Sequence, residues 1–173
     1  MQEELKDIQR RVGATFVHVT HDQEEAMAIA DLIVVMNDGR IEDAGPPERV
    51  YRAPRSRFAA TFLGDMALLP GVVRAGQVET ALGPLGDAGD VAEGTAAAAG
   101  IRPEHLSLDG SQALAEVDVV ESHFLGGHRK LRCAPVAAPE ITLAVHRPVT
   151  VEARVGDRLT LRVDPDTVVV LTR

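Results

Sequence analysis

A histidine stands between a strand-like run and the predicted start of a helix. Residues 15–20 (Thr-Phe-Val-His-Val-Thr) are mostly β-branched or aromatic, which predicts a short buried strand. His21 follows this run directly. Because ligands of open α/β sheets bind at the carboxyl ends of the strands, His21 is expected at a binding edge. A neutral imidazole there can accept a proton from water or donate one to a phosphate oxygen, which makes His21 the candidate catalytic residue.

The residues after His21 have a simpler interpretation. Asp22, with Glu25 three positions later, matches the capping-box pattern of a helix start, so both are interpreted as cap residues rather than catalysts. Taken alone, Thr-His-Asp is more typical of a structural histidine, because a short motif needs its context. Whether His21 has a structural or a catalytic role therefore depends on the elements around it.

Residues 1–64 are predicted to alternate helices and strands, as in a parallel α/β sheet. Helices are expected at 2–12, directly after His21, from Pro47 onward, and between Pro54 and Gly64. Besides residues 15–20, strands are expected at 32–36 and 40–44, joined by an Asn-Asp-Gly turn. This half holds four of the five aromatic residues.

Residues 65–173 have a different composition, rich in Gly, Ala and Val. Short runs with partial alternation predict the strands of a small barrel or sandwich. These runs are 72–74, 77–81, 113–120, 130–133, 141–145, 158–163 and 168–171. The segment 83–100 holds five glycines and is predicted to be a loop region or at most a weak strand.

Composition excludes several classes of protein. The net charge of −8 disfavours nucleic acid and anionic membrane as partners. Residues 65–173 alone have 10 Lys and Arg against 15 Asp and Glu, a charge of −5, and one aromatic residue. The single cysteine, Cys133, allows no internal disulfide and is predicted to be a small buried hydrophobe. No run approaches the length of a membrane span. His18, His123 and His146 have no Cys or carboxylate partners at metal-ligand spacing, so no metal site is expected.

Longer runs of the sequence resemble one family. They are TFVHVTHDQEEAM at 15–27, Ala30-Asp31, IVVM at 33–36, Gly39-Arg40-Ile41, GPPERVY at 45–51, Pro54 and FAATFLG at 58–64. Together these runs closely resemble the ATP-binding cassette (ABC) ATPases of binding-protein-dependent importers, the group that serves maltose, polyamines and ferric iron. Residues 100–105 (GIRPEH) resemble the signature of that family's accessory barrel, the transport-associated oligonucleotide-binding-fold (TOBE) domain.

The resemblance implies a fold and a role for each half. Residues 1–64 would be an α/β remnant, the C-terminal part of the ABC nucleotide-binding domain. Residues 65–173 would be the all-β, OB-like TOBE barrel. His21 matches the family's switch histidine, which contacts the ATP γ-phosphate and helps to position the attacking water across the interface of a complete dimer.

The chain lacks the family's other catalytic motifs. It has no Gly-x-x-x-x-Gly-Lys-Ser/Thr phosphate loop, no Leu-Ser-Gly-Gly-Gln signature and no apolar strand ending in Asp-Glu. The chain therefore resembles the C-terminal portion of a longer ATPase, and as it stands it is not expected to be an enzyme. ATP and magnesium belong to the full-length family protein, and neither is expected to bind this chain alone.

The resemblance also implies the partners and the location. We expect a homodimer that drives the membrane permease subunits of an importer, in the cytoplasm and peripheral to the inner face of the cell membrane. The barrel would regulate or stabilise that dimer. The transported solute stays open, because solute specificity resides in the permease and the external binding protein.

Two rival hypotheses come from other classes. The chain could be a stand-alone ligand-sensing or dimerising module without catalysis, or a small-oxyanion binder like the related molybdate-binding barrels. Arg102, Glu104 and His105 could hold an anion, although Arg-Pro-Glu at a turn is more typical of a fixed corner. Residues 126–129 (Gly-Gly-His-Arg) could do the same, although Gly-Gly between apolar runs usually closes a hairpin.

Overall fold

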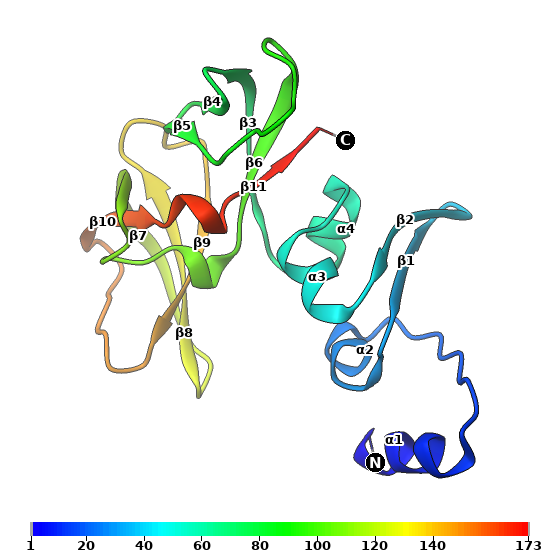
Figure 1. Ribbon diagram of the computed structural model, residues 1–173. Coiled ribbons are helices and arrows are strands. Elements are labelled where there is room, and N and C mark those ends of the chain that lie inside the picture. Colours follow the sequence, from blue (N-terminus) through cyan, green and yellow to red (C-terminus); the bar gives the residue numbers. More distant parts are fainter. Residues whose placement is uncertain (1, 173) are drawn as a thin grey trace. The chain divides into compact units, whose positions relative to one another are not determined.

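The computed structural model describes residues 2–172, with side chains described from residue 4 onward. The chain divides into two compact units, Met1–Gly64 and Asp65–Arg173, coloured blue to cyan and green to red in Figure 1. Each unit has its own hydrophobic core, and each is described by itself.

The first unit contains short helices and one hairpin. Its elements are α1 (Gln2–Val12), α2 (Gln23–Ile29), β1 (Ile33–Asn37), β2 (Arg40–Gly45), α3 (Pro47–Arg52) and α4 (Arg57–Phe62). The predicted helices and the hairpin are confirmed to within a residue or two. Asp38 and Gly39 both have positive φ, 46° and 75°, the backbone of a two-residue turn that matches the twist of the paired strands.

The hairpin and the two following helices bury a small core. Val35 of β1, Val50 of α3 and Ala59 of α4 are almost fully buried there. Next to this core, the buried carboxylate of Asp43 accepts hydrogen bonds from Arg49 Nη1 at 2.9 Å and Nη2 at 2.6 Å, and from the backbone N–H of Arg55 at 2.9 Å. This contact joins β2 to α3 and to the start of the loop before α4.

The expected strand at residues 15–20 is wrong. Residues 14–20 have no regular structure, and none of them pairs with a strand among residues 2–172. Val17 and Val19 are 89% and 91% exposed. A strand needs a neighbouring strand to satisfy its backbone groups, and the described part of the first unit provides only the separate β1–β2 pair. The apolar pattern is therefore present without the sheet that it would join.

The second unit is all β apart from two short 3₁₀ turns, η1 (Pro103–His105) and η2 (Pro165–Thr167). Its strands are β3 (Ala67–Arg74), β4 (Gln77–Thr80), β5 (Gly83–Leu85), β6 (Ala96–Ile101), β7 (Gln112–Phe124), β8 (His128–Pro135), β9 (Leu143–Pro148), β10 (Arg158–Val163) and β11 (Val169–Leu171). They form a four-stranded sheet in the order β10-β7-β8-β9 and a five-stranded sheet in the order β11-β6-β3-β4-β5, with all pairs antiparallel. The expected β-rich, OB-like character of this half is confirmed.

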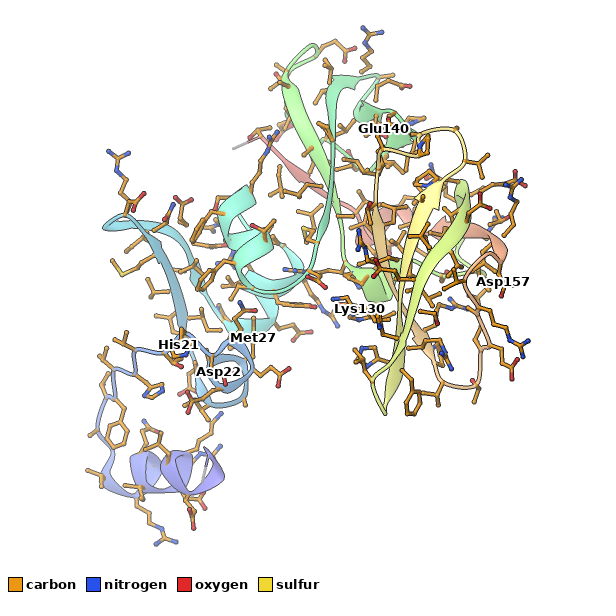
Figure 2. The ribbon with its side chains drawn as sticks, turned by 180° about the vertical axis from the view of Figure 1, so that it is seen from behind. His21, Asp22, Met27, Lys130, Glu140 and Asp157 are labelled. Atoms are coloured by element: carbon orange, nitrogen blue, oxygen red, sulfur yellow. The ribbon has the colours of Figure 1, made fainter. Side chains whose placement is uncertain are left out.

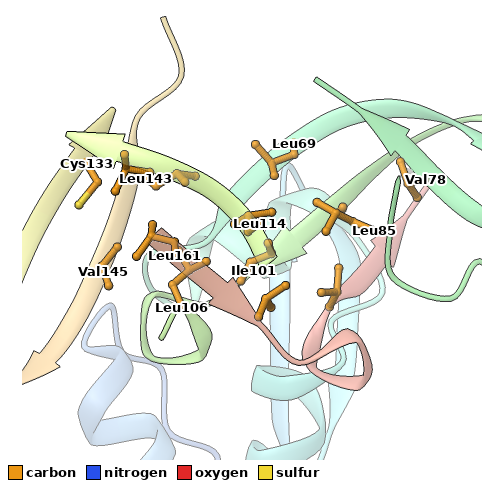
Figure 3. Packing of buried hydrophobic residues seen from close by; sticks show 14 of the residues in the cluster. Leu69, Val78, Leu85, Ile101, Leu106, Leu114, Cys133, Leu143, Val145 and Leu161 are labelled. Carbon is orange, nitrogen blue, oxygen red and sulfur yellow. The ribbon is translucent and has the colours of Figure 1, made fainter. Parts of the chain in front are cut away.

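Both sheets contribute to one core. Leu69, Val78 and Ile101 of the five-stranded sheet belong to the same buried cluster as Leu143 and Leu161 of the four-stranded sheet (Figure 3). A single shared core means that neither sheet is an independent unit.

The expectation for residues 83–100 is wrong in part. The segment contains β5 and the first five residues of β6, and β6 lies between β3 and β11 inside the five-stranded sheet. β6 begins with four alanines, which have low strand propensity, yet residues 97–101 are all buried. Small side chains fit here because both faces of the strand are covered, so packing overrides local propensity.

Candidate functional site

A short network of hydrogen bonds surrounds the backbone on both sides of His21. Asp22 caps α2, since its Oδ1 accepts from the Glu25 N–H at 3.0 Å. The Asp22 N–H in turn donates to Thr20 Oγ1 at 2.9 Å. Thr20 Oγ1 donates to Glu25 Oε2 at 3.0 Å, and His18 Nε2 lies 3.2 Å from the same oxygen. The turn that carries His21 is therefore held from both flanks.

The Glu25 carboxylate does not complete the expected capping box. Its oxygen bonds the side chains of His18 and Thr20, while the N–H of Asp22 bonds Thr20 instead. Hydrogen bonds with His18 and, to a smaller extent, with Thr20 lower the pKa of Glu25 below its ordinary value of 4.5. Sequence analysis missed this pairing, because residues seven positions apart across an irregular segment leave no periodic signal.

His21 lies at the N-terminal end of α2, beside Asp22 (Figure 2). Its side chain is exposed, and it makes no hydrogen bond or ion pair within the part of the chain that the structure describes. His18 is tied to Glu25, whereas His21 is available to another group. Of the two histidines in this segment, the geometry favours His21 as the one that meets a ligand.

Arg102, Glu104 and His105 lie at η1 in the second unit. Arg102 is 1% exposed, and its Nη1 donates to the carbonyl of Asp65 at 3.1 Å. Such a buried, backbone-bound guanidinium fixes the corner between β6 and β7 rather than presenting a cation. The structural interpretation of this motif is favoured over an anion site.

Gly126 and Gly127 form the tight connection between β7 and β8, where the Leu125 N–H donates to the His128 carbonyl at 2.9 Å. The hairpin interpretation of the two glycines agrees with this geometry. On β8, Lys130 is ion-paired with Asp65, and Arg132 is ion-paired with Glu121. These two cations line a shallow hollow, but they already have carboxylate partners.

Cys133 is fully buried, and burial raises the pKa of its thiol to about 11. The thiol is therefore un-ionised and acts as part of the core, as predicted. Among residues 2–172, no group of three or more His, Cys, Asp or Glu side chains is placed to hold a metal ion. No helix in this range is long and apolar enough to cross a membrane.

Comparison with known proteins identifies the second unit. Residues 99–171 match the TOBE domain model. The segment 65–98 belongs to the same compact unit, since β3 pairs with β6 and both sheets bury one core. The chain thus carries a TOBE domain.

Similar proteins extend the comparison over both units. A sulfate/thiosulfate import ATP-binding protein of Chromobacterium violaceum is 44% identical over 151 residues, 83% of this chain and 40% of that protein. An sn-glycerol-3-phosphate import ATP-binding protein of Chromohalobacter salexigens is 41% identical over 172 residues, 93% of this chain and 45% of that protein. A spermidine/putrescine import ATP-binding protein of Pseudomonas fluorescens is 42% identical over 138 residues, 73% of this chain and 37% of that protein.

The chain is therefore similar to the ATP-binding subunits of ABC importers over both of its units, as the sequence resemblance predicted. It spans less than half the length of these relatives.

Proposed function

We propose that this chain is the C-terminal part of the ATP-binding subunit of a binding-protein-dependent ABC importer. In this proposal residues 1–64 complete a nucleotide-binding domain and residues 65–173 are the regulatory, dimerising TOBE domain. The observation that carries the proposal is the turn around His21. Among the described residues the His21 imidazole has no partner, while Thr20, Asp22 and Glu25 hold the backbone on either side.

His21 is assigned to the ATP γ-phosphate of the complete dimer, where it helps to position the attacking water. An exposed imidazole on a hydrogen-bonded turn fits that contact, since it can reach a ligand brought by another segment. When bound, ATP with magnesium supplies the phosphoryl group that is transferred to water. His21 supplies one hydrogen-bonding contact, and the phosphate loop and magnesium ligands have to come from the rest of the nucleotide-binding domain.

The exposed apolar residues before His21 support the same assignment. Phe16, Val17 and Val19 form a strand-like run with no partner strand among the described residues. A neighbouring strand from the remainder of a nucleotide-binding domain would cover this run and bring His21 to the carboxyl edge of a sheet. The partners in this proposal are a second copy of the subunit and the membrane permease subunits, and the location is the cytoplasmic face of the membrane.

A chimaera tests the proposal. Residues 1–173 replace the aligned part of the Chromobacterium violaceum relative, and magnesium-dependent ATP hydrolysis is measured for the chimaera and for the chain alone. We expect hydrolysis by the chimaera and no turnover by the chain alone. Turnover by the purified chain alone, or a folded chimaera without hydrolysis, would contradict the proposal.

A further inference from the structure

Two histidines of the TOBE unit meet across neighbouring strands. His128 is the first residue of β8, and His146 lies on β9. In the antiparallel register His128 is opposite Pro148 and Lys130 is opposite His146, so the two imidazoles are diagonal neighbours on one face of the sheet. Their ring centres lie 4.5 Å apart, and the ring planes are inclined by 48°. Because the pair comes from two strands, no short spacing in the sequence indicates it.

The protein itself leaves both imidazoles available. Neither His128 nor His146 makes a hydrogen bond or an ion pair within residues 4–172, and both side chains are partly buried. His18 and His123 differ, since each of them is tied to a glutamate. Among the described residues, the ring contact of His128 with His146 is also the one place where two imidazoles meet. Each of these rings therefore has nitrogens to offer to a common ligand.

The charges around the pair are suited to a cation. The carboxylates of Glu104 on η1 and of Asp65, which precedes β3, both act on His146, and the ammonium group of Lys130 on β8 opposes them. Lys130 is itself ion-paired with Asp65. Burial, followed by the charge of His128, lowers the pKa of His146 below its ordinary value of 6.5. The imidazole of His146 is therefore neutral at physiological pH, which is the form that binds a metal.

The spacing of the two rings fits one shared metal ion. An imidazole nitrogen binds a divalent transition-metal ion at about 2 Å, which places the ion about 3 Å from the ring centre. Two imidazoles that bind at a right angle around the ion then have ring centres about 4–5 Å apart. The observed separation of 4.5 Å lies within this range, and the inclined planes distinguish the pair from a parallel stack. Arg129 and Arg147 alternate with these histidines along the strands and so lie on the opposite face.

We propose that His128 and His146 form a binding site for a divalent transition-metal ion of the Ni²⁺ or Cu²⁺ type. The two imidazoles occupy adjacent coordination positions, and water completes the shell, since the described residues place no group of three or more His, Cys, Asp or Glu ligands together. Imidazole suits both ions, and a right angle between ligands matches their square-planar or tetragonal geometry. The site involves no residue of the first unit and does not depend on the ATPase assignment.

Calorimetric titration of the full chain, without a histidine tag, measures binding with Ni²⁺ alone as the probe. We expect one Ni²⁺ per chain at about pH 7.5, where both imidazoles are neutral. His128→Gln and His146→Gln should each lower the affinity by about 10²-fold or more, because the second imidazole no longer acts at high effective concentration. The control is His123→Gln, an exposed histidine of β7 that is tied to Glu121, and it should keep the wild-type affinity.

The pH dependence of the affinity gives a second readout. Both imidazoles must lose their protons before they share a metal ion, so protons compete twice. Below both pKa values the affinity of the wild type should therefore fall by about 10²-fold per pH unit, against about 10-fold per unit for a single imidazole. A purely structural role of the two rings would produce no such dependence.

Nuclear magnetic resonance locates the bound ion in the wild type. Ni²⁺ is paramagnetic, so a substoichiometric amount should broaden the backbone amide signals of His128 and His146 before those of other residues. No saturable binding, or saturable binding that survives both substitutions, would overturn the proposal. Loss of binding in only one of the two variants would show a single-histidine contact and would overturn it as well. If a variant does not fold, the wild-type signals decide, and first broadening elsewhere in the chain rejects the site.

Discussion

At the scale of single residues, the Asp43 carboxylate makes a buried polar contact in the first unit. Its side chain is fully buried, and Arg49 and two backbone N–H groups surround it. Gly45 makes this contact possible, because an added Cβ there would lie 2.5 Å from Arg49 Nη2. The Gly-Pro-Pro-Glu-Arg run, which is part of the family resemblance, thus builds the buried contact of Arg49 with Asp43 in this chain.

Replacing Asp43 by alanine should lower the free energy of unfolding of the first unit by about 3 kcal/mol, because it leaves Arg49 without its buried partner. Urea unfolding can be followed by the fluorescence of Tyr51, the single tyrosine, which packs against the same core. Glu48→Ala is the matched control, since that exposed carboxylate also pairs with an arginine of α3, Arg52. A cost below about 1 kcal/mol for Asp43→Ala would show that the buried pair contributes little.

Asp43 also predicts an acid dependence. Burial raises the pKa of Asp43, but the hydrogen bonds from Arg49 and from the Arg55 N–H outweigh it and hold the pKa below its ordinary value of 3.8. Stability from Asp43 is therefore fully present above about pH 3.8 and is lost as the pH falls through the lower folded value. Tyr51 fluorescence should report a steep loss of stability of the first unit below about pH 4. This loss should become shallower in Asp43→Asn, and an unchanged slope in that variant would contradict the assignment.

At the scale of elements, the sequence predicted those whose signal is local. The Asn-Asp-Gly turn, the Pro-started α3, the Asp22 cap and the alternating part of β7 carry their own signals, and all of them appear in the structure. β6 was underestimated, because its alanines favour a strand only once β3 and β11 pair with both of its edges and its two faces are buried. The strand predicted at residues 15–20 is absent for the opposite reason, since a strand-like local sequence forms no strand without a neighbouring strand. The pairing of Glu25 with His18 needed a three-dimensional arrangement that no sequence spacing gives.

The contact between β3 and β4 gives an element-scale prediction. Gly71 of β3 is opposite Thr80, and an added Cβ would lie 2.2 Å from the Glu79 backbone oxygen. Gly71→Ala should therefore separate the two strands and lower the free energy of unfolding by about 2–3 kcal/mol, the typical cost of overpacking. Gly127→Ala is the control, because no atom lies within 4 Å of its added Cβ and its φ is not positive. Thermal unfolding of both variants is measured by circular dichroism. Equal melting temperatures for Gly71→Ala and Gly127→Ala would show that β3 and β4 do not approach this closely.

At the scale of the whole molecule, the two units differ in how complete they are. The TOBE unit has two sheets around a shared core, whereas the first unit has one hairpin, short helices and an uncovered apolar run. Residues 65–173 should therefore fold alone with a cooperative melt, and the family resemblance implies that they form a two-fold dimer. Expression of this segment, with measurement of its solution mass and its melt, tests both statements. An unfolded segment would reject the boundary at residue 65, and a folded monomer would reject the TOBE unit as the dimerising element.

The central claim is that His21 acts on the phosphate end of ATP in the assembled protein. Its most direct test is the rate of ATP hydrolysis by the chimaera with His21→Ala, compared with His18→Ala as a neighbouring histidine that is already tied to Glu25. The account predicts a loss of about 10²-fold or more for His21→Ala, the scale for a positioned proton-transfer or water-orienting group, and a much smaller loss for His18→Ala. A near-normal rate in His21→Ala, or an equal loss in both variants, would contradict the account.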